Sequence, residues 1–394
     1  MARGQAVVGQ SGGPTSVINS SLIGVVEAAR GSSRVGQVYG MRFGIEGFME
    51  DRLVELSGLS RGLLRGLRRT PSSALGSSRH KVHDEDLPRI LEILKKRDIR
   101  FLFLIGGNDT MDTIHRVEAY CRRQGYELTG VGIPKTVDND LFGTDHTPGF
   151  PSAARCIILN VLQAGLLARD MQRVDKFVIY QSVGRDAGWL AAAAAVAKKR
   201  EADAPHLIYL PERPFDRERF LADVADCHRR YGWVSIVCGE GLKQADGSLV
   251  SDSQARDKFG NLEFGAMGGA SVALSLHGLI KERLGLRGEF QITESLIMCA
   301  MDRAVELDLE EAYGCGREAV RIAEAGRSGV MVALERKPGG PYRAHYADVA
   351  LEEVAVKSKP MPAEYINPEG NFVTEAFLQY IRPLVGPIPE YTSL

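Results

Sequence analysis

Residues 101–110 read FLFLIGGNDT, an apolar run that passes directly into a pair of glycines. The first five residues are all hydrophobic, which is typical of a strand in a parallel sheet that helices cover on both faces. Apolar residues at helical spacing follow near Ile114–Arg123. The stretch therefore predicts a strand, a glycine turn and a helix, the repeating unit of an α/β protein.

The same succession recurs on both sides of this stretch. Further strands are predicted at Ala6–Val8, Gly130–Ile133, Phe177–Tyr180 and Trp233–Cys238. Helices are predicted at Val17–Ala29, at Glu85–Arg97 and in the alanine-rich run Leu190–Ala197. Because open parallel sheets bind ligands at the carboxyl ends of their strands, we expect the functional residues in the turns that follow these strands.

Length and charge limit the class of protein. A chain of 394 residues is too long for one ordinary core, so we expect two lobes, each a mostly parallel sheet flanked by helices. Forty-nine basic and fifty acidic side chains give a formal net charge of -1, which argues against nucleic acid or a membrane surface as a partner.

Three further features bear on the environment of the protein. We find no apolar signal segment and no apolar stretch of membrane-spanning length, so we predict a soluble, cytoplasmic protein. The six cysteines contain no C-x-x-C pair, which favours reduced, mostly buried thiols. The polar, glycine-rich segment 252–269 is predicted to be a mobile loop.

The first glycine turn, GQSGGPT at residues 9–15, follows a predicted strand. Paired glycines let backbone N–H groups approach an anion closely, and the dipole of the next helix favours negative charge there. A tight turn without a ligand is the alternative interpretation. The turn matches neither the P-loop nor the dinucleotide-binding fingerprint.

The second turn, IGGNDT at residues 105–110, carries an acid beside the glycines. A carboxylate at Asp109 would repel a bound phosphate unless a cation lay between them, which suggests Mg²⁺. The alternative is that Asp109 caps the following helix.

The third turn, PKTVDND at residues 134–140, gathers a lysine, a hydroxyl and two acids within seven residues. Asp138 and Asp140 repel each other unless they share a cation or a proton. Lys135 would neutralise a phosphoryl donor, and one aspartate would accept the proton of an attacking hydroxyl. A solvated turn with internal charge pairing is the alternative.

These turns resemble the motifs of the phosphofructokinase family, and the resemblance extends over most of the chain, to about Pro383. It rests on SGGPTSVIN (11–19), LGSSRHK (75–81), IGGNDT (105–110), PKTVDND (134–140), VGRDAGW (183–189) and GEGL (239–242). The more similar branch uses pyrophosphate: it has an aspartate and a lysine at the positions of Asp109 and Lys135. The ATP-using branch has glycine at both, which leaves room for the nucleotide.

The resemblance implies a role for each matching residue. Asp138 would be the catalytic base, with Lys135, Thr136 and Arg79 as the other catalytic residues. Donor binding would fall to Gly12, Gly13, Gly107, Asn108 and Asp109, and Mg²⁺ would be held by Asp109 and Asp140. The sugar would be bound by Asp140, Val183, Gly184, Arg185 and Glu240.

The sequence departs from the family pattern at three sites. At the first, Val183 stands where the family usually has methionine. Asn108 stands where many relatives have aspartate, although Asp109 beside it keeps the local charge similar. Ile297 and Met298 align with a Gln-Arg pair whose arginine binds the 6-phosphate of the sugar. Either Arg287 or Lys176 replaces that arginine, or the acceptor carries no phosphate there.

The resemblance implies a two-lobed architecture that the chain crosses more than once. We assign residues 1–147 and about 288–325 to a phosphoryl-donor lobe, and about 148–287 and 326–394 to a sugar-acceptor lobe. The expected activity is reversible, Mg²⁺-dependent transfer from pyrophosphate to the 1-hydroxyl of fructose 6-phosphate, by a homodimer or homotetramer. The alternatives are a pyrophosphate-dependent kinase of another sugar, sugar phosphate or polyol, a silent regulatory subunit, and a nucleotide-binding sensor.

Overall fold

The computed structural model describes residues 3–251 and 270–392. The predicted mobile loop, residues 252–269, lies outside the described residues. Contacts divide the chain into two compact units: Met1–Ser152 with Met298–Lys359, and Ala153–Ile297 with Pro360–Leu394.

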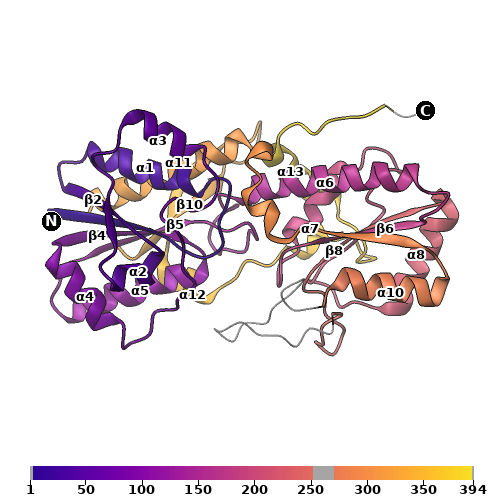
Figure 1. Ribbon diagram of the computed structural model, residues 1–394, viewed down its shortest axis with the longest axis horizontal. Helices are drawn as coiled ribbons and strands as arrows, with labels where there is room; N and C mark the ends of the chain where they lie inside the picture. Colours follow the sequence, from indigo (N-terminus) through magenta and orange to yellow (C-terminus); the bar gives the residue numbers. More distant parts are fainter. Residues whose placement is uncertain (1–2, 252–269, 393–394) are drawn as a thin grey trace. The chain divides into compact units, whose positions relative to one another are not determined.

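The first unit is built on a seven-stranded sheet in the order β11-β10-β5-β4-β1-β2-β3 (Figure 1). Four neighbouring pairs are parallel, while β2–β3 and β10–β11 are antiparallel at the two margins. The strands are β1 (Gly4–Gln10), β2 (Val35–Met41), β3 (Leu53–Glu55), β4 (Ile99–Gly106), β5 (Thr129–Pro134), β10 (Val330–Arg336) and β11 (Ala344–Ala350).

Helices cover both faces of this sheet, as the apolar strands predict (Figure 1). One core contains residues of α1 (Ile18–Arg30), α3 (Arg61–Arg68) and α11 (Glu306–Glu324). The core on the other face contains residues of α2 (Gly44–Met49), α4 (Leu87–Lys96), α5 (Asn108–Arg123) and α12 (Leu351–Val356). Alternate residues of β4 point to opposite faces, so Phe101 and Phe103 enter the first core while Leu102 and Leu104 enter the second.

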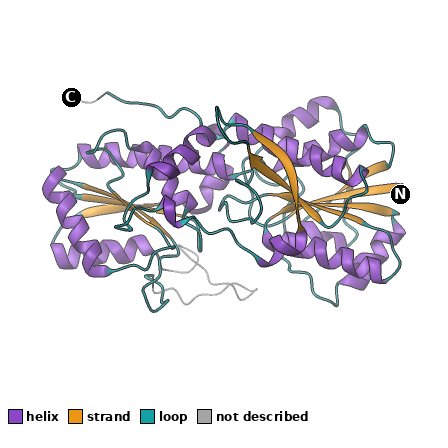
Figure 2. Cartoon of the chain, turned by 180° about the vertical axis from the view of Figure 1, so that it is seen from behind, coloured by secondary structure: helices purple, strands orange, loops and turns teal. Residues whose placement is uncertain are grey.

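The second unit holds a four-stranded parallel sheet in the order β7-β8-β6-β9. Helices flank this sheet as well (Figure 2). Its strands are β6 (Phe177–Ser182), β7 (Leu207–Tyr209), β8 (Val234–Gly239) and β9 (Gly288–Ile292). Its helices are α6 (Phe150–Asp170), α7 (Trp189–Ala193), α8 (Arg217–Tyr231), α10 (Val272–Leu284) and α13 (Glu375–Val385), with 3-10 turns at Ala194–Ala197 and Ala363–Tyr365.

The predicted elements are confirmed in type and order. Each of the five strands expected from the sequence lies within a residue or so of an observed strand, and the alanine-rich run forms α7 and a 3-10 turn. The fold class, α/β with mostly parallel sheets flanked by helices, is confirmed too. All six cysteines are free thiols, and five of them are buried.

The contact-based boundaries differ from the predicted lobes in two regions. Residues 326–359 had been assigned to the acceptor lobe, but they lie in the first unit because β10 pairs with β5 and β11 pairs with β10. The stretch 288–297 lies in the second unit because β9 pairs with β6. Strand pairing between residues far apart in sequence leaves no local signal, so these boundaries could not be located from local patterns.

One helix also departs from expectation. Helix α6 has 21 residues and is apolar enough to span a membrane by length and composition alone, contrary to the prediction that no stretch reaches that length. However, 56% of its most apolar window is buried within the fold. The core helix of a globular fold passes the same test of length and composition, and the burial of α6 is typical of such a helix.

The contact of α1 with α11 depends on two glycines. A Cβ added at Gly316 would lie 2.1 Å from the carbonyl oxygen of Ser21, and one at Gly24 would lie 2.1 Å from that of Tyr313. We predict that Gly316→Ala lowers the free energy of unfolding by about 2 kcal/mol, because the helices must move apart. Urea unfolding measures the change.

The matched control is Gly66→Ala in α3, where an added Cβ meets nothing within 4 Å. Alanine has the higher helix propensity, so this variant should gain about 0.5–1 kcal/mol. Equal effects of the two substitutions would contradict the close-packing explanation.

Candidate active site

Three turns meet at one edge of the first sheet. Strands β5, β4 and β1 are neighbours and parallel, so the residues after Pro134, Gly106 and Gln10 emerge side by side. In sequence order, the first turn follows Gln10, the second follows Gly106 and the third follows Pro134. We call them together the glycine-edge turns. The sequence predicted that the three turns carry the chemistry, and the sheet order brings them together.

Lys135 links the third turn to the first. Its Nζ donates a hydrogen bond to the carbonyl oxygen of Gly13 at 2.7 Å, and its backbone N donates to that of Gly106 at 3.1 Å. Since β4 lies between β5 and β1 in the sheet, this hydrogen bond joins the residues that follow two strands which are not themselves paired. A Cβ at Gly12 would stand 3.2 Å from the ammonium nitrogen, in a left-handed backbone conformation with φ +76°. Glycine at position 12 is therefore required twice over.

The environment of Lys135 lowers its basicity. The residue is only 5% exposed, and burial lowers the pKa of its ammonium group to about 8. The charges of Asp138 and Asp140 act in the opposite direction, whereas that of Arg79 adds to the lowering. An anion bound at this edge would favour the charged form of Lys135, against the effect of burial on its pKa.

The segment before Arg79 supports the first turn. Gly12 N donates to the carbonyl oxygen of Ser78 at 3.1 Å, and Ser77 Oγ donates to that of Gly12 at 2.6 Å. Arg79 itself is exposed, and Lys81 contacts Asp109 at 3.3 Å. Motifs that are about sixty residues apart in sequence therefore share one edge of the sheet.

The second turn leads into α5 through Gly107, which is the N-cap residue of the helix. The alternative interpretation of Asp109 as the cap is thus wrong; its side chain is 72% exposed and lies in the first helical turn. Asn108 Oδ1 is buried and has no hydrogen-bond partner among the described residues. An orphaned buried oxygen is costly, and a cation or a water would satisfy it.

These oxygens fit a magnesium ion. Within the described ranges, no group of three or more His, Cys, Asp or Glu side chains is arranged to hold a metal. Mg²⁺ in phosphotransferases keeps several waters and takes only one or two protein oxygens beside the phosphates of its substrate. Asn108 Oδ1 and the neighbouring carboxylate of Asp109 are donors of that kind, so the residues present suit a metal held mainly by a bound diphosphate.

The third turn continues into residues 136–149, which we call the aspartate loop. Thr136 Oγ1 accepts a hydrogen bond from Asp138 N at 3.1 Å. Burial raises the pKa of the Asp140 carboxyl, against its own backbone N–H and the charges of Lys359 and Lys135. Both aspartates are half-buried, and their charges act on the buried ammonium of Lys135.

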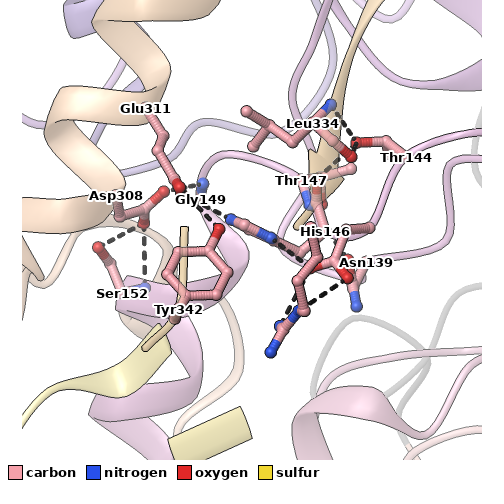
Figure 3. Close-up of polar contacts among 12 residues, drawn as sticks. Asn139, Thr144, His146, Thr147, Gly149, Ser152, Asp308, Glu311, Leu334 and Tyr342 are labelled. Carbon is pink, nitrogen blue, oxygen red and sulfur yellow. Dashed lines mark hydrogen bonds and ion pairs between the residues drawn. The ribbon is translucent and has the colours of Figure 1, made fainter. Parts of the chain in front are cut away.

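Buried polar side chains fix the far end of the aspartate loop (Figure 3). Asp308 of α11 accepts from Gly149 N at 2.9 Å and from Ser152 N and Oγ at 3.0 and 2.6 Å. His146 is fully buried: its Nε2 lies 2.7 Å from Glu311 Oε2 and its Nδ1 lies 3.0 Å from Asp145 Oδ2. Tyr342 donates to the second oxygen of Glu311 at 2.7 Å.

This arrangement makes His146 a cation. Burial opposes the charge, but the hydrogen bonds to Asp145 and Glu311 outweigh it and raise the pKa of His146 to about 9. Asp145 is also paired with Arg336 at 3.0 Å. The sequence analysis missed His146, Asp308, Glu311 and Lys359, because none of them belongs to a short motif and their partners are distant in sequence.

In the second unit, the predicted acceptor residues also lie at carboxyl strand ends. Val183, Gly184 and Arg185 follow β6, and Glu240 follows the adjacent β8. Glu240 Oε1 accepts from Gly184 N at 3.2 Å, and burial raises the pKa of this carboxyl despite the charge of Arg185. Gly184 has φ +120°, a conformation that is open to glycine. The structure therefore brings these four residues together.

Arg287 does not join them. It precedes β9, which runs parallel to β6 with Gly288 opposite Phe177, and it pairs with Asp175 at 3.0 Å. Six strand residues, or about 20 Å, separate that edge from Gly184. Within one chain, Arg287 and the neighbouring Lys176 therefore lie far from Gly184, and their role as substitutes for the missing arginine stays a prediction.

Met298 lies against the donor side instead. Its Sδ would stand 3.5 Å from a Cβ added at Gly13, and its carbonyl oxygen accepts from Ser16 Oγ at 3.4 Å. The other aligned residue, Ile297, is buried in a 3-10 turn at Glu294–Cys299. Neither residue offers a donor for a phosphate through its side chain.

Comparison with known proteins adds to this geometry. The family model described as Phosphofructokinase matches residues 5–303. A pyrophosphate–fructose 6-phosphate 1-phosphotransferase of Methylococcus capsulatus is 38% identical over all of this chain and 96% of the relative. A sulfofructose kinase of Alkalicoccus urumqiensis is 31% identical over 89% of this chain and 88% of the relative.

Solved structures give the same picture. The crystal structure of a pyrophosphate-dependent phosphofructokinase from Marinobacter aquaeolei matches with a TM-score of 0.87 and 36% identity. The match covers 99% of this chain and 94% of that one.

The pKa of His146 predicts how stability depends on pH. A histidine whose pKa rises from 6.5 to about 9 on folding contributes fully below pH 6.5 and loses its contribution as the pH rises through 9. A shift of this size corresponds to about 3 kcal/mol. Urea unfolding of the wild type on both sides of this range measures the loss.

The loss should vanish in His146→Gln and persist in His83→Gln, which changes an exposed histidine of the same unit. If the wild type and His146→Gln lost the same stability over this range, His146 would not be the group responsible.

Proposed function

This chain belongs to the phosphofructokinase family, and on that premise we propose that it transfers a phosphoryl group from pyrophosphate to the 1-hydroxyl of fructose 6-phosphate. The observation that carries the proposal is the buried ammonium of Lys135 beneath the first glycine turn, together with Asp109 at the start of α5. These are the two positions at which the ATP-using branch has glycine. A small diphosphate suits the space that remains.

Donor binding follows from the glycine edge. The N–H groups near Gly12, Gly13 and Gly107 are candidates to bind the phosphates, helped by the positive end of α5. Lys135 neutralises part of the donor's charge at close range, and Arg79 supplies a guanidinium from the exposed side. Magnesium, held by Asn108, Asp109 or Asp140 and by the diphosphate, would supply further charge neutralisation.

Phosphoryl transfer then needs a base and a position. The carboxylate of Asp138 accepts the proton of the acceptor hydroxyl as its oxygen bonds to the terminal phosphorus. The bond from that phosphorus to the bridging oxygen breaks, and phosphate leaves. Thr136 orders the turn by accepting from Asp138 N, so the base is presented in one conformation. No covalent enzyme intermediate is required. Because donor and product phosphates differ little in energy, we expect the reaction to be reversible.

Acceptor binding is assigned to the carboxyl edge of the second sheet. Glu240 would accept hydrogen bonds from sugar hydroxyls, while Gly184 and Arg185 would contact the sugar from the end of β6. The absence of a donor side chain at Ile297 and Met298 favours a second candidate, a pyrophosphate-dependent kinase of another sugar, sugar phosphate or polyol. A silent regulatory subunit is disfavoured, since the third turn keeps its lysine and both aspartates.

We further propose a cytoplasmic homodimer or homotetramer, as the family resemblance implies. The formal net charge of -1 supports a protein whose ligands are small molecules rather than nucleic acid or membranes.

A steady-state assay tests donor, acceptor and base together. We expect turnover with fructose 6-phosphate, Mg²⁺ and pyrophosphate, and none with ATP. Asp138→Asn should lower kcat by about 10³ or more because the base is lost, whereas Asp84→Asn, an exposed aspartate of the same unit, should not change it. Turnover with ATP alone would sink the donor assignment, and turnover only with another acceptor would establish the second candidate.

Lys135→Met tests the donor site separately. Loss of a charge-assisted contact of about 1.5–3 kcal/mol should raise KM for pyrophosphate ten- to a hundredfold, with the acceptor KM unchanged. Because the ammonium form is lost as the pH rises above about 8, the wild type should also lose pyrophosphate affinity there more steeply than the variant. Lys95→Met, at an exposed position of α4, is the control. Equal KM values in both variants would exclude Lys135 from the donor site.

A further inference from the structure

Lys359 makes four hydrogen bonds to the aspartate loop. Its Nζ donates to Asn139 Oδ1 at 3.1 Å and to the carbonyl oxygens of Thr144 and Asp145 at 3.0 and 2.8 Å. Its backbone N donates to the carbonyl oxygen of Asp140 at 2.7 Å. Three acceptors around one nitrogen match the three donors of an ammonium group. Lys359, the last residue of this unit in the sequence, therefore binds the loop through three side-chain hydrogen bonds and one backbone hydrogen bond.

Asn139 connects these contacts to the two aspartates, because its backbone conformation sets the direction of both. It has φ +57°, in the left-handed region that asparagine tolerates better than most residues, and it stands between Asp138 and Asp140. It is fully buried, and its Oδ1 accepts from Thr147 N at 3.1 Å as well as from Lys359. Because a change of its backbone angles would turn both neighbouring carboxylates, the contacts that hold Asn139 also aim Asp138 and Asp140.

The rest of the loop is fixed from another side. Thr144 Oγ1 accepts from Leu334 N of β10 at 2.9 Å, and Asp145 N donates to the carbonyl oxygen of Leu334 at 2.8 Å (Figure 3). Those contacts, with Asp308 and His146, anchor residues 144–152. Lys359 bridges from this anchored part, at Thr144 and Asp145, to Asn139 and Asp140 beside the base. It connects a fixed frame to the part of the loop whose conformation decides the chemistry.

We propose that Lys359 is a positioning residue for phosphoryl transfer, holding Asn139 in its left-handed conformation so that Asp138 faces the acceptor hydroxyl. The inference rests on the proposed function for its catalytic part. It predicts that loss of Lys359 lowers turnover without weakening substrate binding, because the hydrogen bonds of its ammonium group go to the loop.

The primary test compares Lys359→Met with Lys357→Met in the full chain. Lys357 is exposed, pairs with Glu353 at 2.9 Å and lies over the ring of Phe142 in the loop. In Lys359→Met, kcat should fall about tenfold to a hundredfold, as a misplacement near 1 Å does, with both KM values within about threefold. In Lys357→Met, all three should stay within about twofold of the wild type.

Two further readouts separate positioning from misfolding. The stoichiometry of pyrophosphate binding, measured by calorimetry with Mg²⁺, should stay at the wild-type value, since a partly unfolded sample would lose sites in proportion to activity. Amide hydrogen exchange in residues 136–147 should be faster in Lys359→Met and unchanged in Lys357→Met. Only the first variant removes the side-chain hydrogen bonds that Lys359 donates to the loop. Unchanged exchange in Lys359→Met overturns the proposal, and so does faster exchange with normal kcat.

Charge and geometry are distinguished by Lys359→Arg, which keeps the charge but not the compact ammonium geometry. Full activity of this variant would mean that a positive charge alone suffices, which overturns the proposal that the hydrogen bonds of Lys359 position Asn139. If Lys359→Met fails to fold, Asn139→Gly replaces it: glycine accepts the left-handed conformation but removes Oδ1, so a similar fall in kcat is expected and a normal kcat contradicts the proposal.

Failure of the proposed function has a different signature. A wild type that binds pyrophosphate but does not turn over fructose 6-phosphate rejects that acceptor. The hydrogen-exchange comparison then tests only whether Lys359 holds the aspartate loop in place. Faster exchange at residues 136–147 in Lys359→Met upholds that role, and unchanged exchange overturns it.

Discussion

The ammonium group of Lys135 is buried under the first glycine turn, where its Nζ meets the carbonyl oxygen of Gly13 at 2.7 Å. A buried charge is tolerated only with partners, so the ends of β5 and β1 are bound to each other across β4. The glycine at position 12 suits this contact, since a Cβ there would stand 3.2 Å from the ammonium nitrogen. Donor recognition thus depends on one charge that the fold cannot leave unpaired.

Behind this edge, the same rule organises a second layer. His146, Glu311 and Asp308 are buried, and each is satisfied by partners from elements far apart in the chain. Such networks are costly when one member is missing and rigid when complete. They give residues 298–359 a role in the first unit, because α11 and β10 supply groups that hold the aspartate loop. Lys359, the last residue of this segment, binds Asn139.

The second unit uses a milder form of the same design. Glu240 accepts from Gly184 N, and the two lie at neighbouring strand ends, so a hydroxyl-bearing ligand would meet a fixed carboxylate rather than a cluster of cations. Arg287 had seemed available to bind a phosphate because it is basic and near the departing motif in sequence. Parallel pairing of β9 with β6 sends it to the opposite edge. Distance along the chain is therefore a poor guide to which edge of a sheet a residue reaches.

The sequence by itself determined the elements and the three glycine-edge turns, because apolar runs, paired glycines and the PKTVDND motif are local signals that report burial and backbone conformation directly. It also placed Lys135 and Asp109, the residues proposed to bind the donor, within those motifs. Only the tertiary structure decided where the unit boundaries fall, that Asp109 is not the cap of α5, and that Lys359, His146 and Asp308 support the aspartate loop. The physical reason is that strand pairing and buried hydrogen bonds join residues up to 289 positions apart, and their partners are chosen by three-dimensional proximity, which no local pattern encodes.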